Sequence, residues 1–361
     1  MRLMEVMNCL TVCGGAENFE VNFCQFAQKE TDFFPVILYE SSGFPLYKKL
    51  ISFSNKAPFV VGKRNSIDIR AIKRLRRYIR DNKIDVIHTE NNCLITTFFA
   101  SVSSKTPIVH TIHLPPNKET SSWLAKLLYK FIYRSKRVTP VTLTEENSVN
   151  FSNTYHFPKK IFCIKNGVNS EEFFSDIPLE KRSIDCAVLA RMSEPKNYPQ
   201  ILNIMCEVHR INPQLKFAIY GEGDLEDFVL DFAKQHDMYS YVSINKPTSK
   251  PQEVLKNAKT LLLPSLFEAS PMVIMEAMSA GCVCIASHVG GIPDLISSDV
   301  DGFTFAPEDV KSFSSKIVEI CSFGEKFNDL SKAAETKARN CFSLKRTWDE
   351  YYSLFQTNLK R

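Results

Sequence analysis

The chain has 361 residues, a length that suits two domains of about 150 to 180 residues each. Forty-four per cent of the residues are hydrophobic and 24% are charged, as in ordinary soluble globular proteins, which excludes a mostly disordered chain. The net charge of +5 is unevenly divided, because residues 1–165 hold 24 basic and 13 acidic residues and the remainder holds 21 and 27.

The eleven cysteines are scattered and odd in number, and no CxxC pair occurs. We therefore expect neither a zinc site nor a disulfide framework, and the pattern favours a reducing cytosol. The chain begins with strand-like residues and shows no signal peptide. No apolar run approaches the roughly 18 residues that a membrane span needs, so a cytoplasmic protein is expected.

The first half of the chain alternates short apolar runs with helical stretches. CLTVCGGAEN (9–18) places Gly14 and Gly15 between the first predicted strand and the first predicted helix. Backbone N–H groups and a helix dipole meet an anion at such a position. The apolar runs that follow are KIDVIHT (83–89), TPIVHTI (106–112), VTPVTLT (138–144) and KIFCIKN (160–166).

Two helical stretches in this half carry most of the positive charge. Residues 63–83 hold nine basic and two acidic residues, and residues 121–137 combine five basic residues with Trp123, Leu127 and Phe131 at helical spacing. Either both helices have a solvated basic face, or they contact an anionic membrane surface or a polyanionic acceptor. Nucleic acid is not expected, because no recognised binding motif accompanies the charge.

After the polar connector SDIPLEKRS (175–183), the alternation resumes. Predicted helices at 197–211, 224–236 and 271–280 separate apolar runs at 184–190, 215–221, 241–245, 260–264, 282–287 and 302–306. This alternation predicts an α/β protein with parallel sheets covered by helices on both faces. Two successive series predict two Rossmann-like domains that face one another, with ligands bound beyond the carboxyl ends of the strands.

The loops after these strands hold most of the unusual residues. VLARMSEPKN (188–197) brings Arg191 and Lys196 into one short loop, as in a site for a phosphate group. Gly221, in IYGEGDL (219–225), either lets the backbone approach a ligand closely or belongs to a plain turn.

The stretch LPSLFEASPMVIMEAMSAG (263–281) contains two carboxylates among apolar residues, Glu268 and Glu276. Ser270 followed by Pro271 predicts a helix N-cap with proline at the first helical position, and Gly281 ends the helix. Glu268 then lies in the loop after a buried strand, and Glu276 lies one and a half turns into the helix. Either both acids accept hydrogen bonds from sugar hydroxyls, or Glu268 has a capping role and Glu276 is a surface residue.

With these motifs, the sequence resembles the retaining glycosyltransferases of family 4, which have the GT-B fold. The resemblance covers nearly the whole chain. Its most specific part is the E-x7-E pattern formed by Glu268 and Glu276, with the glycine pair of VGGIPDLI after it. The supporting matches, in the family's order, are GGAEN (14–18), VIHT (86–89), VHTIH (109–113), KNGVNSEEFF (165–174), LARMSEPKN (189–197) and YGEGDL (220–225).

The resemblance implies a role for each site residue. Arg191 and Lys196 bind the donor diphosphate, Glu268 contacts the transferred sugar, and Glu276 holds the ribose hydroxyls. His113 matches a family histidine beside the sugar, although as a lone residue it is equally compatible with a core histidine. His88 and His110 are expected to serve their strands. The remaining donor-binding residues are Gly14, Gly15, Gly221, Asn245, Lys246, Ala269, Ser270, Pro271, Met272 and Val273.

The implied chemistry is front-face attack by the acceptor, with retention and without a metal or other cofactor. A nucleoside diphosphate leaves readily, so the protein mainly supplies positive charge and alignment. The sequence also holds a DxD pattern, Asp299 to Asp301, which we interpret as turn chemistry before Gly302. Ala269 and Ala190 stand where the family often has glycine, which leaves the identity of the donor open.

The predicted protein is a cytoplasmic, peripheral membrane hexosyltransferase that uses a nucleotide sugar, by default UDP-linked. Its acceptor is predicted to be a cell-surface polysaccharide or lipid-linked glycan precursor. The alternatives are a GT-B epimerase or phosphorylase, or a non-catalytic GT-B subunit that stabilises a partner transferase. The predicted domains are 1–168 for the acceptor and 169–340 for the donor. Residues 341–361 form a last helix that returns to the first domain through Trp348, Tyr352 and Phe355.

Overall fold

The computed structural model describes residues 1–361 except 12–13, 66–67, 114–122, 159–160 and 361. Parts of the glycine-rich loop and of the second basic stretch therefore lie outside the described residues. The chain divides into two compact units, of which the first holds residues 1–167 and 344–361 and the second holds residues 168–343. The predicted boundaries differ from these by one residue after the first sheet and by three residues before the last helix.

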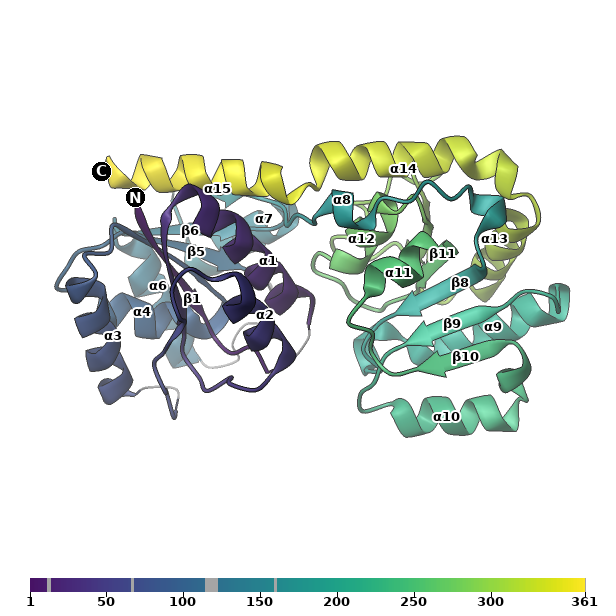
Figure 1. Ribbon diagram of the computed structural model, residues 1–361, viewed down its shortest axis with the longest axis horizontal. Helices are drawn as coiled ribbons and strands as arrows, with labels where there is room; N and C mark the ends of the chain where they lie inside the picture. The colour runs from purple at the N-terminus through teal and green to yellow at the C-terminus, as the bar shows by residue number, and fades with distance from the viewer. Residues whose placement is uncertain (12–13, 66–67, 114–122, 159–160, 361) are drawn as a thin grey trace. The chain divides into compact units, whose positions relative to one another are not determined.

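The first unit contains a sheet of seven described strands, all parallel, in the order β3-β2-β1-β4-β5-β6-β7. Figure 1 labels β1, β5 and β6 of this sheet. The order reverses between β1 and β4, which is the point where such sheets bind ligands. The strands are β1 (Arg2–Met7), β2 (Asp32–Ile37), β3 (Phe59–Val60), β4 (Val86–Glu90), β5 (Ile108–Ile112), β6 (Val138–Thr142) and β7 (Phe162–Cys163).

The helices of this unit form two layers. Contacts join α3, α4, α6 and α7 along one face of the sheet, and α1 contacts both α2 and α15. Sequence reasoning did not predict β2, in which Pro35 interrupts the apolar run, or the two-residue β3. The helices are α1 (Gly15–Glu30), α2 (Pro45–Phe53), α3 (Ile69–Asp81), α4 (Leu94–Ala100), α6 (Trp123–Arg134), α7 (Glu145–Tyr155) and α15 (Leu344–Leu359).

The last helix, α15, packs against α1 through an aromatic cluster. Trp348 and Phe355 are buried, and the rings of Trp348 and Tyr351 both lie 5.3 Å from the ring of Phe23 on α1. The predicted anchoring stripe is therefore right for Trp348 and Phe355, but wrong for its middle residue. Tyr352 is only partly buried, whereas Tyr351 is completely buried. Positions i+3 and i+4 lie on the same side of a helix, so the spacing from Trp348 could not distinguish the two tyrosines.

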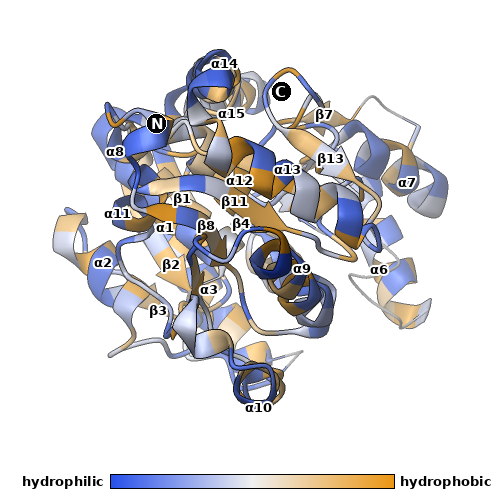
Figure 2. Ribbon diagram, turned by 90° about the vertical axis from the view of Figure 1, so that its right-hand side faces the viewer, coloured by the Kyte–Doolittle hydropathy of each residue, from blue (hydrophilic) through white to orange (hydrophobic). Residues whose placement is uncertain are grey.

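The second unit contains six described parallel strands in the order β10-β9-β8-β11-β12-β13, which reverses between β8 and β11. Figure 2 shows the strongly hydrophobic β11 in this sheet, as expected for a strand covered on both faces. The strands are β8 (Ile184–Leu189), β9 (Phe217–Tyr220), β10 (Val242–Asn245), β11 (Ala258–Leu263), β12 (Val283–Ser287) and β13 (Phe303–Phe305).

The predicted strands of this unit and the three predicted helices are confirmed, whereas the helices at 170–173, 251–256, 310–322 and 328–341 were not predicted. The main difference concerns the helix after β11, which begins at Met272 with Pro271 as its N-cap, so Ser270 is not the cap and makes no capping hydrogen bond. Gly281 ends this helix as predicted, with φ at +62°. The helices are α8 (Ser170–Phe173), α9 (Tyr198–Ile211), α10 (Glu226–Gln235), α11 (Pro251–Lys256), α12 (Met272–Ser279), α13 (Val310–Ser322) and α14 (Asn328–Cys341).

Candidate active site

Lys196 and Glu268 form an ion pair at the carboxyl edge of the second sheet. Lys196 follows β8 and Glu268 follows β11, which are neighbours at the point where the strand order reverses. Lys196 Nζ lies 2.5 Å from Glu268 Oε1, and Ser265 Oγ donates to the same oxygen at 2.8 Å. The Glu268 side chain is 8% exposed and that of Lys196 is 25% exposed. The fold therefore brings together two of the predicted site residues from positions 72 apart in the sequence.

The loops that carry this pair are joined by two hydrogen bonds, both accepted by backbone carbonyl oxygens. Leu266 N donates to the carbonyl of Pro195, and Asn197 Nδ2 donates to the carbonyl of Pro264. These bonds hold the loop after β8 against the loop after β11. The lysine and the glutamate are thereby kept in register without relying on their own side-chain contact.

The glycine pair after β12 secures the backbone of Glu268. Gly291 N donates to the Glu268 carbonyl oxygen at 3.0 Å. Gly290 has φ at +52°, and a Cβ added there would lie 2.0 Å from the same oxygen. Only glycine fits this position, since both the backbone angle and the close approach exclude a side chain.

Close packing also explains why residue 221 is a glycine. A Cβ added at Gly221 would lie 2.1 Å from the carbonyl oxygen of Ala190, so the loop after β9 touches the loop after β8 at this residue. Met192 N also donates to the carbonyl of Glu222. The sequence allowed a close approach to a ligand or a plain turn, and the structure adds another reason for glycine here, which is close packing against the loop that holds Arg191.

Arg191 is exposed at the carboxyl end of β8. Within the described part of the chain, its guanidinium has no ion-pair or hydrogen-bond partner. A cation held by a fixed loop and free of internal partners is available to bind an anion.

Helix α12 presents its N-terminus at the same edge of the sheet, directly after Ser270 and Pro271. The first N–H groups of a helix lack intrahelical acceptors, so those of Met272 and Val273 and the positive end of the helix dipole face the preceding loop. Glu276 is the fifth residue of α12 and is partly buried. Ala269 is partly buried between Glu268 and this helix.

Asn245 and Lys246 lie at the end of β10. Asn245 Nδ2 donates to the backbone carbonyl of Ile219, which ties this strand end to β9. Lys246 Nζ pairs with Glu226 at 2.5 Å, with 69% of the lysine side chain exposed. In this structure both predicted donor-binding side chains contact protein groups.

The DxD pattern of this unit forms a turn, as predicted. Asp301 is buried, its Oδ1 accepts from the backbone N–H of Ser297, and its Oδ2 pairs with Lys337 at 2.8 Å. Asp299 has φ at +65° and donates its N–H to the carbonyl of Gly302. Because the Asp301 carboxylate is occupied on both sides, the pattern offers no open pair of carboxylates for a cation.

In the first unit, Gly14 is the N-cap of α1, in agreement with its predicted place before the helix, and Gly15, which was predicted to precede the helix, is its first residue. His113 follows β5 and is 8% exposed, and its Nε2 lies 2.6 Å from Oε2 of the buried Glu90. His110 has a structural role in the sheet, as expected, because its Nδ1 forms a hydrogen bond with the Thr89 carbonyl oxygen on the neighbouring strand. Burial lowers the pKa of His110 to about 3.

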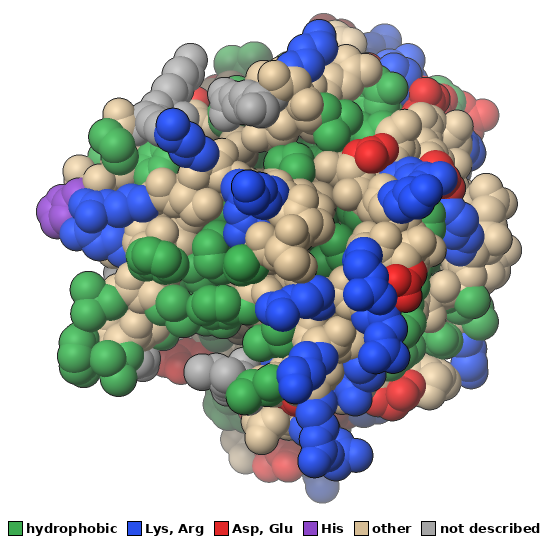
Figure 3. All heavy atoms as spheres, turned by 90° about the vertical axis from the view of Figure 1, so that its left-hand side faces the viewer, with side chains coloured by type: hydrophobic (Ala, Val, Ile, Leu, Met, Phe, Trp, Pro, Cys, Tyr) green, Lys and Arg blue, Asp and Glu red, His purple; other side chains and the backbone are tan. Residues whose placement is uncertain are grey.

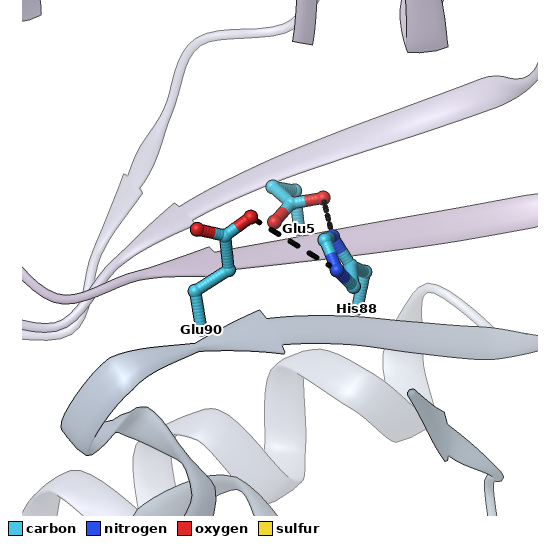
Figure 4. A group of neighbouring side chains, drawn as sticks. All are labelled: Glu5, His88 and Glu90. Carbon is cyan, nitrogen blue, oxygen red and sulfur yellow. Dashed lines mark hydrogen bonds and ion pairs between the residues drawn. The ribbon is translucent and has the colours of Figure 1, made fainter. Parts of the chain in front are cut away.

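Sequence reasoning missed a buried polar cluster around His88. One ligand-type atom each of Glu5, His88 and Glu90 lies within 4.8 Å of the others, a spacing suited to a metal ion (Figure 4). However, His88 Nδ1 lies 2.8 Å from Glu5 and His88 Nε2 lies 2.9 Å from Thr111 Oγ1. With both ring nitrogens in hydrogen bonds, the imidazole has no lone pair left for a metal, so we interpret the group as a hydrogen-bonded cluster. The available signal was an acid in the apolar strand RLMEVM.

Two family models match successive parts of the chain. The model described as Glycosyltransferase Family 4 matches residues 13–172, and the one described as Glycosyl transferases group 1 matches residues 169–337. The chain belongs to glycosyltransferase family 4. It is therefore a glycosyltransferase with the two-sheet GT-B fold, as predicted.

Curated relatives and solved structures agree with this membership. An Escherichia coli UDP-Gal:alpha-D-GlcNAc-diphosphoundecaprenol alpha-1,3-galactosyltransferase is 25% identical over 80% of this chain and 79% of its own length. A Staphylococcus aureus poly(ribitol-phosphate) alpha-N-acetylglucosaminyltransferase is 20% identical over 89% of this chain and 66% of its own length. The crystal structure of Anabaena HepE in complex with UDP superimposes with a TM-score of 0.85 at 14% identity, over 99% of this chain and all of HepE.

Proposed function

We propose that this family 4 enzyme transfers a hexose or N-acetylhexosamine from a UDP-sugar, with retention, to a lipid-linked glycan or polysaccharide precursor. The E. coli relative is named for UDP-Gal and a diphosphoundecaprenol-linked acceptor, and HepE was crystallised with UDP. In this chain, the observation that carries the proposal is the ion pair between Lys196 and Glu268 at the reversal point of the second sheet.

This ion pair suits a site that is filled by a sugar diphosphate. Without a ligand, Lys196 and Glu268 neutralise each other, which lowers the cost of holding a largely buried carboxylate. A bound diphosphate offers Lys196 a second anion, and the sugar hydroxyls offer Glu268 hydrogen-bond donors. Arg191 supplies another cation from the same loop, and the first N–H groups of α12 add donors for phosphate or sugar oxygens.

The proposed reaction is a substitution at the anomeric carbon of the donor. The acceptor oxygen forms a bond to this carbon as the bond to the phosphate oxygen breaks on the same face, and the acceptor proton passes to the departing phosphate. Arg191 and Lys196 stabilise the negative charge that grows on the leaving UDP. His113 contacts the transferred sugar. The cations of the chain carry this stabilisation, so we propose that the reaction needs neither a metal ion nor another cofactor.

We further propose that the first unit binds an anionic membrane surface that presents the acceptor. Helix α3 exposes six basic side chains, and α6 exposes four large apolar ones. Figure 3 shows a column of Lys and Arg side chains beside a hydrophobic group on one face of this unit. No helix of the described chain is long and apolar enough to cross a membrane. The side chains are Arg70, Lys73, Arg74, Arg76, Arg77 and Arg80 on α3, and Trp123, Leu124, Leu127 and Phe131 on α6.

A donor screen tests the proposed activity. The purified chain is incubated with UDP-Gal, UDP-Glc, UDP-GlcNAc, UDP-GalNAc and GDP-Man, with and without a polyprenyl diphosphate-linked sugar, and nucleotide release and glycolipid formation are measured. We expect transfer from one UDP-sugar, an α-linked product, and unchanged rates in the presence of EDTA. Transfer only from GDP-Man, a β-linked product, or loss of activity with EDTA that added metal restores would each refute the corresponding part of the proposal.

A vesicle assay tests the membrane surface separately. We expect co-sedimentation with vesicles that contain phosphatidylglycerol at low salt, and release at high salt because exposed charges are screened. Phe131→Ser should weaken this binding. Phe323→Ser changes an aromatic residue of the second unit with similar exposure, 53% against 65%, and should leave binding unchanged. Equal effects of the two substitutions, or binding that salt does not affect, would contradict the assignment.

A further inference from the structure

A stripe of polar side chains crosses the middle of the first sheet on one face. Side chains alternate between the faces of a strand, so His88 and Glu90 of β4 lie on the same face. Glu5 of β1 is the register partner of His88. Thr111 of β5 bonds to His88, and His113 just beyond β5 bonds to Glu90. Figure 4 shows the Glu5, His88 and Glu90 side chains gathered on one side of the strands.

Two helices enclose this stripe. From α1, Glu20 lies close enough to Glu90 for each carboxyl group to shift the pKa of the other, and Glu20 Oε1 accepts a hydrogen bond from Nδ2 of the adjacent Asn91. From α15, the Tyr351 hydroxyl bonds to Thr111 Oγ1 at 2.7 Å. Glu5, Glu90, His88 and Tyr351 are completely buried, and Glu20 is 2% exposed. His113, with 9% of its side chain exposed, is the member through which the cluster reaches the surface of the described chain.

The hydrogen bonds divide the cluster into two arms. In one arm, Glu5 binds His88 Nδ1, and His88 Nε2 continues through Thr111 to Tyr351 on the last helix. In the other arm, Glu90 Oε2 lies 2.6 Å from His113 Nε2. The two arms approach each other where Glu90 Oε1 lies 4.0 Å from His88 Nε2. The first arm anchors the sheet to α15, and the second holds the one member that reaches solvent.

Charge is distributed so that Glu90 is the ionised acid of the second arm. Burial, followed by the charge and hydrogen bond of Glu90, raises the pKa of Glu20 well above its ordinary value, so Glu20 is a neutral donor. Burial opposes ionisation of Glu90 too, but the charge and hydrogen bond of His113 and the charge of His88 outweigh it, and the pKa of Glu90 is lowered. A carboxylate only accepts hydrogen bonds, so His113 Nε2 must carry the hydrogen that joins the two residues.

We propose that Glu90 is a positioning residue that fixes the ring orientation of His113 and keeps hydrogen on its Nε2 for sugar transfer. This inference rests on the proposed function, in which His113 contacts the transferred sugar. With Nε2 committed to Glu90, the ring presents Nδ1 to the substrate. Nδ1 has no hydrogen-bond partner among the residues that the structure describes, so it is the ring nitrogen left to form a hydrogen bond with a sugar hydroxyl.

The arrangement provides a matched pair of substitutions. Glu20→Gln keeps a neutral side chain that can donate to Glu90, so it should leave turnover within about threefold of the wild type. Glu90→Gln removes the carboxylate and leaves His113 without an anionic acceptor. In comparable histidine–acid pairs, loss of the orienting acid lowers the rate by a factor of about tens to thousands. We therefore expect kcat to fall at least about tenfold, with the donor KM within about threefold of the wild-type value.

A second readout does not depend on activity. Long-range proton–nitrogen NMR correlations of imidazole-labelled protein report which ring nitrogen carries hydrogen, and His113→Gln identifies the His113 signals by their loss. We expect hydrogen on Nε2 in the wild type and in Glu20→Gln, and a mixture of tautomers in Glu90→Gln. The double variant Glu90→Gln/His113→Gln should lose no more activity than His113→Gln alone, because the acid acts through the histidine.

The outcomes separate the two proposals. An active wild type with normal turnover in Glu90→Gln, additive losses in the double variant, or a wild-type His113 without hydrogen on Nε2 overturns the positioning role alone. Absence of transfer from every donor refutes the proposed function, and the NMR result still decides whether Glu90 sets the tautomer. If Glu90→Gln fails to fold, the wild-type tautomer and the Glu20→Gln rate remain as tests, and an unprotonated Nε2 overturns the proposal.

Discussion

Replacing Lys196 by methionine tests the candidate active site most directly. The substitution keeps the aliphatic stem and removes the ammonium group 2.5 Å from Glu268. Exposed ion pairs contribute about 0.2–1 kcal/mol, and breaking a fully buried pair costs about 3–5 kcal/mol. The Lys196 side chain is 25% exposed and Ser265 still donates to Glu268, so the cost should be about 1–2 kcal/mol. For a unit of this size, that lowers the melting temperature by about 2–8 °C.

The effect on catalysis should be larger, because Lys196 is proposed to stabilise the departing diphosphate. Losing one such donor typically lowers turnover by about 100-fold or more. The matched control is Lys259→Met, since Lys259 pairs with Asp185 at 2.7 Å, with side chains that are 13% and 14% exposed, at the amino ends of β8 and β11. Differential scanning calorimetry should show similar destabilisation in both variants. Only Lys196→Met should lower kcat by about 100-fold. Equal rates in the two variants would refute the assignment of Lys196 to the site.

Three further predictions concern the site and the buried cluster. Glu276→Ala should weaken UDP binding measured by isothermal calorimetry, and unchanged affinity would reject its ribose role. Gly290→Ala should lower kcat far more than Gly43→Ala: both residues have positive φ, but only at Gly290 would a Cβ meet Glu268, whereas Gly43 has nothing within 4 Å. Glu20 keeps a proton in the folded chain that the unfolded chain releases above about pH 4, so this side chain makes the free energy of unfolding fall as pH rises. Urea titrations at pH 5 and pH 7.5 should therefore show a smaller decrease in stability for Glu20→Gln than for the wild type, and equal decreases would show that Glu20 is not a buried neutral acid.

Local sequence patterns were sufficient to predict much of the order of elements and the loops in which the candidate site residues lie. Strand β11 and helix α12 follow from local properties: an apolar run for the strand, proline before the helix and glycine after it. Parallel strands joined by helices end at a common edge, so the loops with Lys196 and Glu268 were expected at one edge of the sheet. A shift of one residue at the start of α12 is the expected uncertainty, because capping depends on contacts that the pattern does not contain.

Which side chains meet, by contrast, depends on the pairing of distant strands. The partnership of Lys196 with Glu268 spans 72 residues, and that of Glu90 with His113 spans 23 residues and two strands. Glu5 is an acid in an apolar strand, and its partner is evident only when β4 pairs beside it in register. Hydrophobic periodicity reports which face of an element is buried, but not which buried polar group lies opposite. That depends on strand order and register, which long-range pairing sets and local sequence does not.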